Sequence, residues 1–243
     1  MPKSVIVIPC YNEADRLKAE HCLQLVESPD NHVLLVDDGS SDGTPELLEE
    51  ISAQSERIFV HTMPQNGGKA EAVRAGLHFG LEAGADIVGY LDADMATPPE
   101  EILSMLAAMD DGVVKVVLGS RVQLLGRRVN RQPFRHYLGR GFATVASWAL
   151  QLSVYDTQCG AKLLRDTPAL RHAIVEPFTS RWVFDVELFG RLLSAPEPLS
   201  VHEFLEVPLQ RWEDVAGSKL TWSGMATAGL DLGRIALRRR SGR

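Results

Sequence analysis

The sequence predicts an α/β fold with a mostly parallel central sheet flanked by helices. Short apolar runs rich in β-branched residues, such as Ser4–Ile8 and His32–Val36, alternate along the chain with stretches whose apolar residues recur at helical spacing. Because strand–helix–strand connections are right-handed crossovers, this alternation builds a parallel sheet. Polar loops follow the runs that end at Ile8, Val36 and Leu91. Ligands of such sheets bind beyond the carboxyl ends of the strands, so these loops are the expected binding edge.

The individual elements follow from the same patterns, taken in chain order. We expect strands at Ser4–Ile8, His32–Val36, Ile58–His61, Asp86–Leu91 and Val113–Leu118. We expect helices ending near Val26, beginning at Pro45, and at Lys69–Leu81, Pro98–Met109, Tyr137–Leu152 and Phe184–Leu193. Pro9 is expected to stop the first strand. Thr44 is the expected N-cap of the helix that begins at Pro45.

Composition limits the kinds of partner. The chain has 243 residues, 45% of them hydrophobic, which is enough for one domain with a full core. The formal net charge is −7, yet Gly112–Tyr155 contains no acid. The arginines of that stretch are Arg121, Arg127, Arg128, Arg131, Arg135 and Arg140. An acidic chain with a local arginine cluster is not expected to bind nucleic acid generally; it fits a phosphorylated ligand or an acidic membrane surface.

Three scattered cysteines without metal-binding spacing favour a reducing compartment. The chain enters a strand at once, so no signal peptide is expected. The longest charge-free apolar run, Gly141–Tyr155, is shorter than the ~20 residues that span a bilayer. We therefore expect a cytoplasmic protein, with peripheral contact at the cytoplasmic face of a membrane or with a membrane-protein partner.

Two carboxylates, Asp92 and Asp94, follow the apolar strand that ends at Leu91, and Pro98 then opens a helix. Acids at the end of a buried strand are costly unless a positive charge neutralises them. Oxygen ligands suit Mg²⁺ or Mn²⁺, so one interpretation is a metal site for a nucleotide diphosphate. The alternative is that both acids merely end the strand and are solvated.

Several short motifs stand in a fixed order along the chain. The first set is Val7–Glu13, Val36–Thr44, Asn66–Lys69 and Asp92–Asp94. The second set is Gly119–Arg121, Asp156–Lys162, Arg181–Leu188 and Glu213–Leu220. Together they resemble the family 2 glycosyltransferases of GT-A fold. The second set is similar to the dolichyl-phosphate β-glucosyltransferase branch and, more distantly, to the dolichyl-phosphate mannose synthases.

The resemblance implies a donor site for a nucleotide sugar. The residues it places there are Pro9, Tyr11, Glu13, Val36, Asp38, Lys69, Asp92, Ala93, Ala96, Arg211 and Lys219. Asp92 and Asp94 would hold the metal, which stabilises the departing nucleoside diphosphate. The mannose synthases carry a glutamine where this chain has Ala96, and the glucosyltransferases a small residue. This favours UDP-glucose, with GDP-mannose as the alternative.

The resemblance also implies an acceptor site formed by Arg121, Arg131, Arg135, Arg140 and Asp156. Arginines beside an amphipathic stretch fit a lipid phosphate at a membrane surface. A phosphate monoester is already ionised at neutral pH, so it needs no general base. An alcohol acceptor would need one, and Asp185 or Glu187 is the candidate, unless both are structural.

We therefore expect a GT-A domain over residues 1–222 and an amphipathic basic helix or tail over 223–243. The expected activity is metal-dependent, inverting transfer of a hexose to a polyprenyl phosphate, with Asp94 and Arg121 central to catalysis. Two alternatives stay open: a soluble or glycan hydroxyl acceptor, and a nucleotide-sugar-binding subunit without catalysis.

Overall fold

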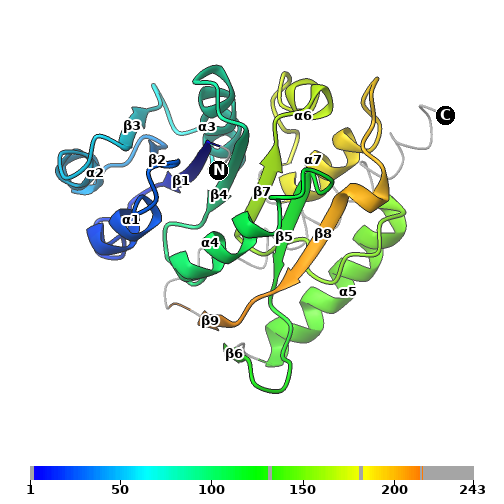
Figure 1. Ribbon diagram of the computed structural model, residues 1–243. Coiled ribbons are helices and arrows are strands. Elements are labelled where there is room, and N and C mark those ends of the chain that lie inside the picture. The colour runs from blue at the N-terminus through cyan, green and yellow to red at the C-terminus, as the bar shows by residue number, and fades with distance from the viewer. Residues whose placement is uncertain (1–2, 131–132, 181–182, 214, 216–243) are drawn as a thin grey trace.

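The computed structural model describes residues 3–130, 133–180, 183–213 and 215 (Figure 1). Its sheet contains β1 (Ser4–Cys10), β2 (Asn31–Asp37), β3 (Ile58–Thr62), β4 (Ile87–Leu91), β5 (Val116–Ser120), β7 (Ala161–Arg165) and β8 (Phe204–Pro208). The strand order is β3-β2-β1-β4-β7-β5-β8. All neighbouring pairs of this sheet are parallel except those of β7, which runs antiparallel to both β4 and β5. The predicted mostly parallel sheet is confirmed.

Helices cover both faces of the sheet. They are α1 (Ala19–Leu25), α2 (Thr44–Ser52), α3 (Lys69–Glu82), α4 (Pro99–Ala107), α5 (Pro133–Leu150), α6 (Pro168–Ala173) and α7 (Phe184–Leu192). A 3₁₀ turn at Val201–Glu203 precedes β8. A short parallel pair, β6 (Arg128–Asn130) with β9 (Arg211–Glu213), lies beyond one end of the main sheet (Figure 1).

The side chains of each strand alternate between two hydrophobic clusters. Val5 and Val7 of β1 face the cluster that contains the buried residues of α3, α5, α6 and α7. Ile6 and Ile8 face the opposite cluster, which contains those of α1, α2 and α4. This is the period-2 alternation of a strand buried on both sides, and it explains why Val5 to Ile8 of β1 are all apolar.

Two local expectations were wrong. Pro9 does not end the first strand, which continues to Cys10, and the Cys10 carbonyl accepts a hydrogen bond from the Asp38 amide at 2.8 Å. Thr44 is not the N-cap of α2, since Gly43 occupies that position. The Thr44 hydroxyl instead accepts from the Glu13 amide at 2.8 Å, which ties the loop after β1 to the loop after β2.

Strand β7 is absent from our sequence-based expectations. Its second residue is Lys162, a charge that argues against a central strand, yet this side chain is fully buried. The predicted helix over 223–243 lies outside the described residues.

Among the helices the structure describes, none is both long and apolar enough to cross a membrane.

Candidate active site

Loops after β1, β2 and β4 meet at the carboxyl edge of the sheet, where the sequence predicted a binding site. The first two are joined by reciprocal contacts: the Asn12 amide donates to Ser40 Oγ at 3.0 Å, and the Ser41 amide donates to Asn12 Oδ1 at 2.9 Å. Asn12 has φ of 52°, a left-handed conformation that asparagine tolerates better than most residues. These contacts fix the edge that a nucleotide would approach.

Asp38 joins the loop after β2 to the glycine-containing turn before α3. Its buried carboxylate accepts from the Gly67 amide at 2.7 Å and from the Gly68 amide at 2.8 Å. Asn66 Nδ2 also donates to the Asp38 carbonyl at 3.0 Å. Asp38 therefore holds this glycine-containing turn in place, and Lys69 begins α3 directly after it.

The other predicted nucleoside contacts differ in how accessible they are. Tyr11 is 38% exposed, so part of its side chain reaches the surface. The Glu13 carboxylate is buried and accepts from Arg16 Nε at 2.7 Å and Nη2 at 2.5 Å. Val36 is fully buried in the core cluster that also contains β1. Any Val36 contact with a nucleoside would therefore be made by its backbone. Pro9 is partly buried near the end of β1.

Asp92 and Asp94 directly follow β4. Lys69 Nζ lies 2.5 Å from Asp92 Oδ1, so the start of α3 brings a cation to the acidic pair. Asp94 Oδ1 accepts from the Ala96 amide at 3.1 Å. Burial first, and the Asp92 charge second, raise the pKa of the Asp94 carboxyl. The predicted cluster of Lys69, Asp92 and Asp94 is thus brought together.

Gly160 is built into this cluster. The Asp92 amide donates to the Gly160 carbonyl at 3.0 Å, and a Cβ atom at residue 160 would overlap the Asp92 carboxylate. Sequence reasoning missed this role, although the Asp156–Lys162 motif contains the glycine. The only sequence signal for this role is the presence of a glycine within that polar motif.

The acidic pair fits a divalent cation. Burial together with the neighbouring Asp92 charge makes the ionised form of Asp94 unfavourable, and a hard cation that takes oxygen ligands would relieve this. Across the described ranges no group of three or more His, Cys, Asp or Glu side chains is arranged to hold a metal. Asp92 and Asp94 would therefore be supplemented by ligands from outside this set, such as water or a substrate phosphate. Ala93 and Ala96 are buried beside them and offer no side-chain ligand.

Arg121 and Asp156, predicted as separate acceptor contacts, bind each other. Arg121 Nε donates to Asp156 Oδ2 at 2.6 Å, and Nη2 donates to Oδ1 at 2.8 Å. Burial acts to lower the pKa of Arg121, but the charge and hydrogen bonds of Asp156 outweigh it, so the pKa is raised overall. The guanidinium also lies 5.4 Å from the Trp212 ring centroid. The pair fixes the loop after β5 against the 151–160 loop.

Asp185 and Glu187, the candidate bases, lie at the start of α7 and are both occupied. Asp185 Oδ1 accepts from the Tyr90 hydroxyl and lies 2.8 Å from Lys162 Nζ, and Oδ2 accepts from Gln158 at 3.4 Å. Glu187 accepts from the Thr179 amide at 2.9 Å and hydroxyl at 3.1 Å, the Ser180 amide at 3.2 Å and Arg191 at 2.8 Å.

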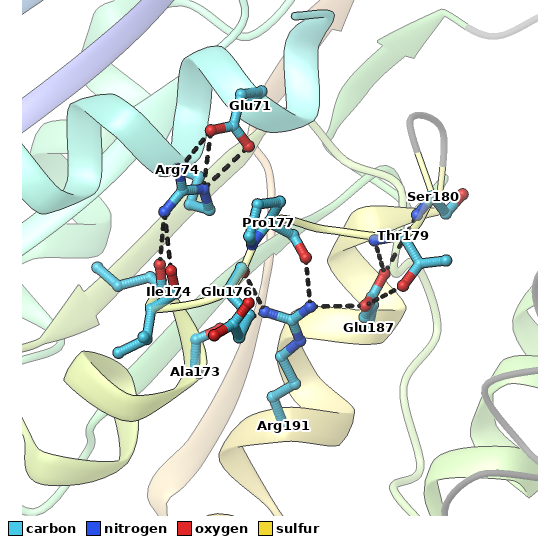
Figure 2. Close-up of polar contacts among 11 residues, drawn as sticks. Glu71, Arg74, Ala173, Ile174, Glu176, Pro177, Thr179, Ser180, Glu187 and Arg191 are labelled. Atoms are coloured by element: carbon cyan, nitrogen blue, oxygen red, sulfur yellow. Dashed lines mark hydrogen bonds and ion pairs between the residues drawn. The ribbon is translucent and has the colours of Figure 1, made fainter.

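Figure 2 shows that Glu187 contacts the segment before α7. Arg191 donates to the carbonyls of Ala173, Glu176 and Pro177 as well as to Glu187 (Figure 2). Arg74 of α3, ion-paired with Glu71, donates to the carbonyls of Ile174 and Val175. Glu187 therefore helps to hold this segment in place, and its contacts favour the structural alternative over the role of a base.

The remaining predicted site residues either lie away from the acidic pair or have side chains that the structure does not describe. Arg211 lies in β9, where its half-exposed side chain pairs with Glu100 at 3.0 Å. Within the described contacts its partner is thus α4, not the acidic pair. Arg131 and Lys219 lie outside the described residues, and Arg135 and Arg140 belong to α5, with side chains that are not described.

The chain is similar in sequence to known glycosyltransferases. Residues 5–168 match the model of Glycosyl transferase family 2. A dolichyl-phosphate β-glucosyltransferase of Trichomonas vaginalis is 31% identical, covering 98% of this chain and 72% of the relative. The Drosophila melanogaster enzyme of that name is 34% identical, and the match covers 96% of this chain and 74% of the relative. A polyprenol monophosphomannose synthase of Mycolicibacterium smegmatis is 28% identical over 93% and 84%.

Solved structures agree on the fold. Glucosyl-3-phosphoglycerate synthase from Mycobacterium tuberculosis, in complex with Mn²⁺, UDP and glucosyl-3-phosphoglycerate, has a TM-score of 0.69 at 17% identity, covering 98% of this chain and 80% of that one. A mannosyltransferase from Pyrobaculum calidifontis, in complex with GDP-mannose and Mn²⁺, has a TM-score of 0.65 at 17% identity, covering 98% and 64%. The predicted GT-A type of fold and the predicted family are both confirmed. The chain belongs to glycosyl transferase family 2.

Proposed function

We propose that the chain is a metal-dependent inverting glycosyltransferase that moves glucose from UDP-glucose to a polyprenyl phosphate at a membrane surface. The observation that carries the proposal is the state of Asp185 and Glu187. Both oxygens of each carboxylate are engaged by donors within the protein: the Tyr90 hydroxyl, the Lys162 ammonium and the Gln158 amide for Asp185, and Thr179, Ser180 and Arg191 for Glu187. Carboxylates held in these contacts are not positioned to take a proton from an acceptor, and a phosphate acceptor needs no base because it is already ionised.

The donor would bind across the loops that meet at the carboxyl edge. The partly exposed Tyr11 would lie against the base, and the turn that Asp38 holds would present the start of α3 to the diphosphate. Asp92 and Asp94 would hold Mg²⁺ or Mn²⁺, which when bound offsets the charge that develops on the leaving UDP. Lys69 adds a fixed ammonium at the same place. Ala96 supplies no ligand, which supports the glucosyltransferase pattern over the mannose pattern.

The transfer itself is a single displacement. An oxygen of the acceptor phosphate forms a bond to the anomeric carbon from the face opposite UDP. The bond between that carbon and the β-phosphate oxygen breaks, so the configuration inverts and UDP leaves with the electron pair. Arg121 would meet the acceptor, because Asp156 engages its Nε and Nη2 atoms and thereby fixes the direction of the guanidinium.

Exposed apolar side chains in the segment that follows Arg121 support a lipid acceptor. Leu124 and Leu125 belong to the loop after β5, and Leu125 is fully exposed at 105%. Val145 and Trp148 are exposed on α5. All four lie in the acid-free stretch 112–155, which also carries the arginine cluster. Exposed apolar side chains among cations suit the interface of an anionic bilayer.

Transfer of radiolabelled glucose tests the proposal. Incubating the protein with UDP-[¹⁴C]glucose, Mn²⁺ and undecaprenyl phosphate should place label in an organic-extractable product. Asp94→Ala should lose this activity without losing the fold. Label that appears only in the aqueous phase with a glycan acceptor would instead establish an alcohol acceptor. Binding of UDP-glucose without turnover on any acceptor would establish a non-catalytic subunit, and GDP-[¹⁴C]mannose in a parallel reaction tests the donor.

A further inference from the structure

Lys162 is a buried cation that the proposed reaction does not use. Its side chain is fully buried, and Nζ lies 2.8 Å from Asp185 Oδ1. The ammonium also donates to the Cys159 carbonyl and lies 5.2 Å from the ring centroid of Tyr90 and 5.9 Å from that of Phe189. The charge is therefore enclosed by partners within the described core.

Stability alone does not account for such a pair. Replacing a buried ion pair by well-packed uncharged residues is often neutral or stabilising, because desolvation of both charges offsets their attraction. Lys162 also sits in β7 directly opposite Tyr90 of β4, in the middle of the sheet. A charge pair that adds little stability in the middle of the sheet indicates that its function is to hold neighbouring groups in position.

The contacts of Lys162 lead directly to Asp92. The carbonyl that its ammonium holds belongs to Cys159, the residue before Gly160. The Gly160 carbonyl accepts from the Asp92 amide at 3.0 Å, and its Cα lies so close to the Asp92 carboxylate that no Cβ would fit. A shift of the 159–160 backbone would therefore move Asp92 with it.

Asp185 completes the arrangement from α7. Its carboxylate balances the ammonium, and Tyr90, which lies two residues before Asp92, donates to the same oxygen. The short chain of contacts thus connects α7, β7 and β4 at the base of the acidic pair. The chain of contacts ends at the Asp92 carboxylate, which Lys69 also contacts.

We propose that Lys162, paired with Asp185, is a positioning residue that fixes the backbone at Cys159–Gly160 and through it the Asp92 carboxylate. The meaning of this for catalysis rests on the proposed function, in which Asp92 helps to hold the donor's cation. The positioning itself does not, because it concerns only the geometry of Asp92.

The test combines hydrogen exchange with metal binding in Lys162→Met/Asp185→Asn. This double variant removes both charges together, and the amide oxygen of the introduced asparagine can still accept from Tyr90, so folding is expected to survive. The exchange rate of the Asp92 amide, resolved by NMR or fragment-resolved mass spectrometry, should rise while global stability is unchanged. Mn²⁺ affinity in the presence of UDP should fall about 10- to 100-fold, the usual effect of removing an outer-sphere partner.

Lys115→Met is the matched control. Lys115 Nζ also donates to the carbonyl three residues earlier, that of Gly112, at 2.6 Å, but just before β5 and away from Asp92. This variant should show wild-type exchange at Asp92 and wild-type Mn²⁺ affinity.

A stable double variant with wild-type exchange at Asp92 would overturn the inference. If it does not fold, Lys162→Met alone removes the ammonium and leaves Asp185 with Tyr90 and Gln158 as donors. Asp92 exchange that is faster than any change in global unfolding explains would then support the inference, and wild-type exchange would overturn it. Wild-type protein that binds neither Mn²⁺ nor UDP would defeat the proposed function, and the exchange comparison would still decide the positioning role.

Discussion

The backbone of Gly160 lies against the carboxylate of Asp92 with no room for even a methyl group between them. The two residues flank β7 and β4, neighbouring strands of opposite direction, and are joined by the Asp92 amide and the Gly160 carbonyl. The position of an acidic side chain is thus set by the shape of a backbone and not only by hydrogen bonds.

Gly160→Ala should therefore displace Asp92 and impair donor binding. A misplacement on the order of 1 Å in a reacting site costs about 10²-fold in rate. Steady-state transfer assays and Mn²⁺ titration measure the loss. Gly141→Ala on α5, where a Cβ meets nothing within 4 Å, is the control and should behave as wild type. Equal activity of the two variants would contradict the crowding at Asp92.

Asp38→Ala should loosen the turn before α3. The amides of Gly67 and Gly68 would lose their common acceptor, which costs about 1–3 kcal/mol of folding free energy where the groups stay buried. Urea unfolding measures this loss. The KM for UDP-glucose should rise as well, because Lys69 follows the turn; an unchanged KM would place the turn outside the donor site.

Asp94→Asn should raise thermal stability in the absence of divalent cations while abolishing transfer. Burial and the Asp92 charge raise the pKa of Asp94 in the folded protein. The ionised carboxylate therefore destabilises the fold at neutral pH, and this destabilisation is lost as the pH falls and Asp94 is protonated. In wild-type protein, Mn²⁺ at about 100 times its Kd should add about 2.7 kcal/mol. Thermal shifts with and without Mn²⁺ test both statements, and a full Mn²⁺ shift in the variant would refute the ligand assignment.

Glu187→Gln should lower stability without removing catalysis. Glutamine keeps one acceptor but loses the charge that pairs with Arg191 at 2.8 Å, and a weakened buried contact of this kind costs about 1–3 kcal/mol. The kcat of the folded fraction should match wild type. A variant of normal stability with no turnover would show that Glu187 acts as a base after all.

Alkaline pH should destabilise the protein partly through its buried thiols. Burial raises the pKa of Cys22 to about 12 and of Cys159 to about 11. Each thiol ionises first in the unfolded chain, so stability is complete below about pH 8.5 and falls as pH rises towards those values. The slope is about 1.4 kcal/mol per pH unit for each thiol. Urea unfolding between pH 8 and 11 should show a shallower decline in Cys22→Ala.

The sequence could predict the carboxyl edge of the sheet that carries Asp92 and Asp94 because its signals are local. Apolar runs of strand length, each followed by a polar loop, placed Asp92 and Asp94 at the carboxyl edge, and the family resemblance added Lys69. The structure brings Lys69 into contact with Asp92 there. Loops from separate strands meet there because the carboxyl ends of parallel strands lie at the same edge of the sheet.

The contacts of the proposed acceptor residues could not be predicted in the same way because they are long-range. Arg121 and Asp156 are separated by 35 positions, and no spacing rule indicates that they satisfy each other. Lys162 was overlooked for a related reason: a lysine in a short run argues against a buried strand, and only the carboxylate of α7 makes its burial tolerable.

Strand β7 has a consequence for how such a chain can diversify. Because it runs against its neighbours, the connection between β5 and β7 leaves and re-enters the sheet at the same edge, between adjacent strands. Residues 121–160 therefore begin and end on adjacent strands of the sheet, while the proposed nucleotide site lies on the loops after β1, β2 and β4. If this segment meets the acceptor as proposed, exchanging it between relatives would change the acceptor without disturbing the sheet, provided that its last residue remains a glycine.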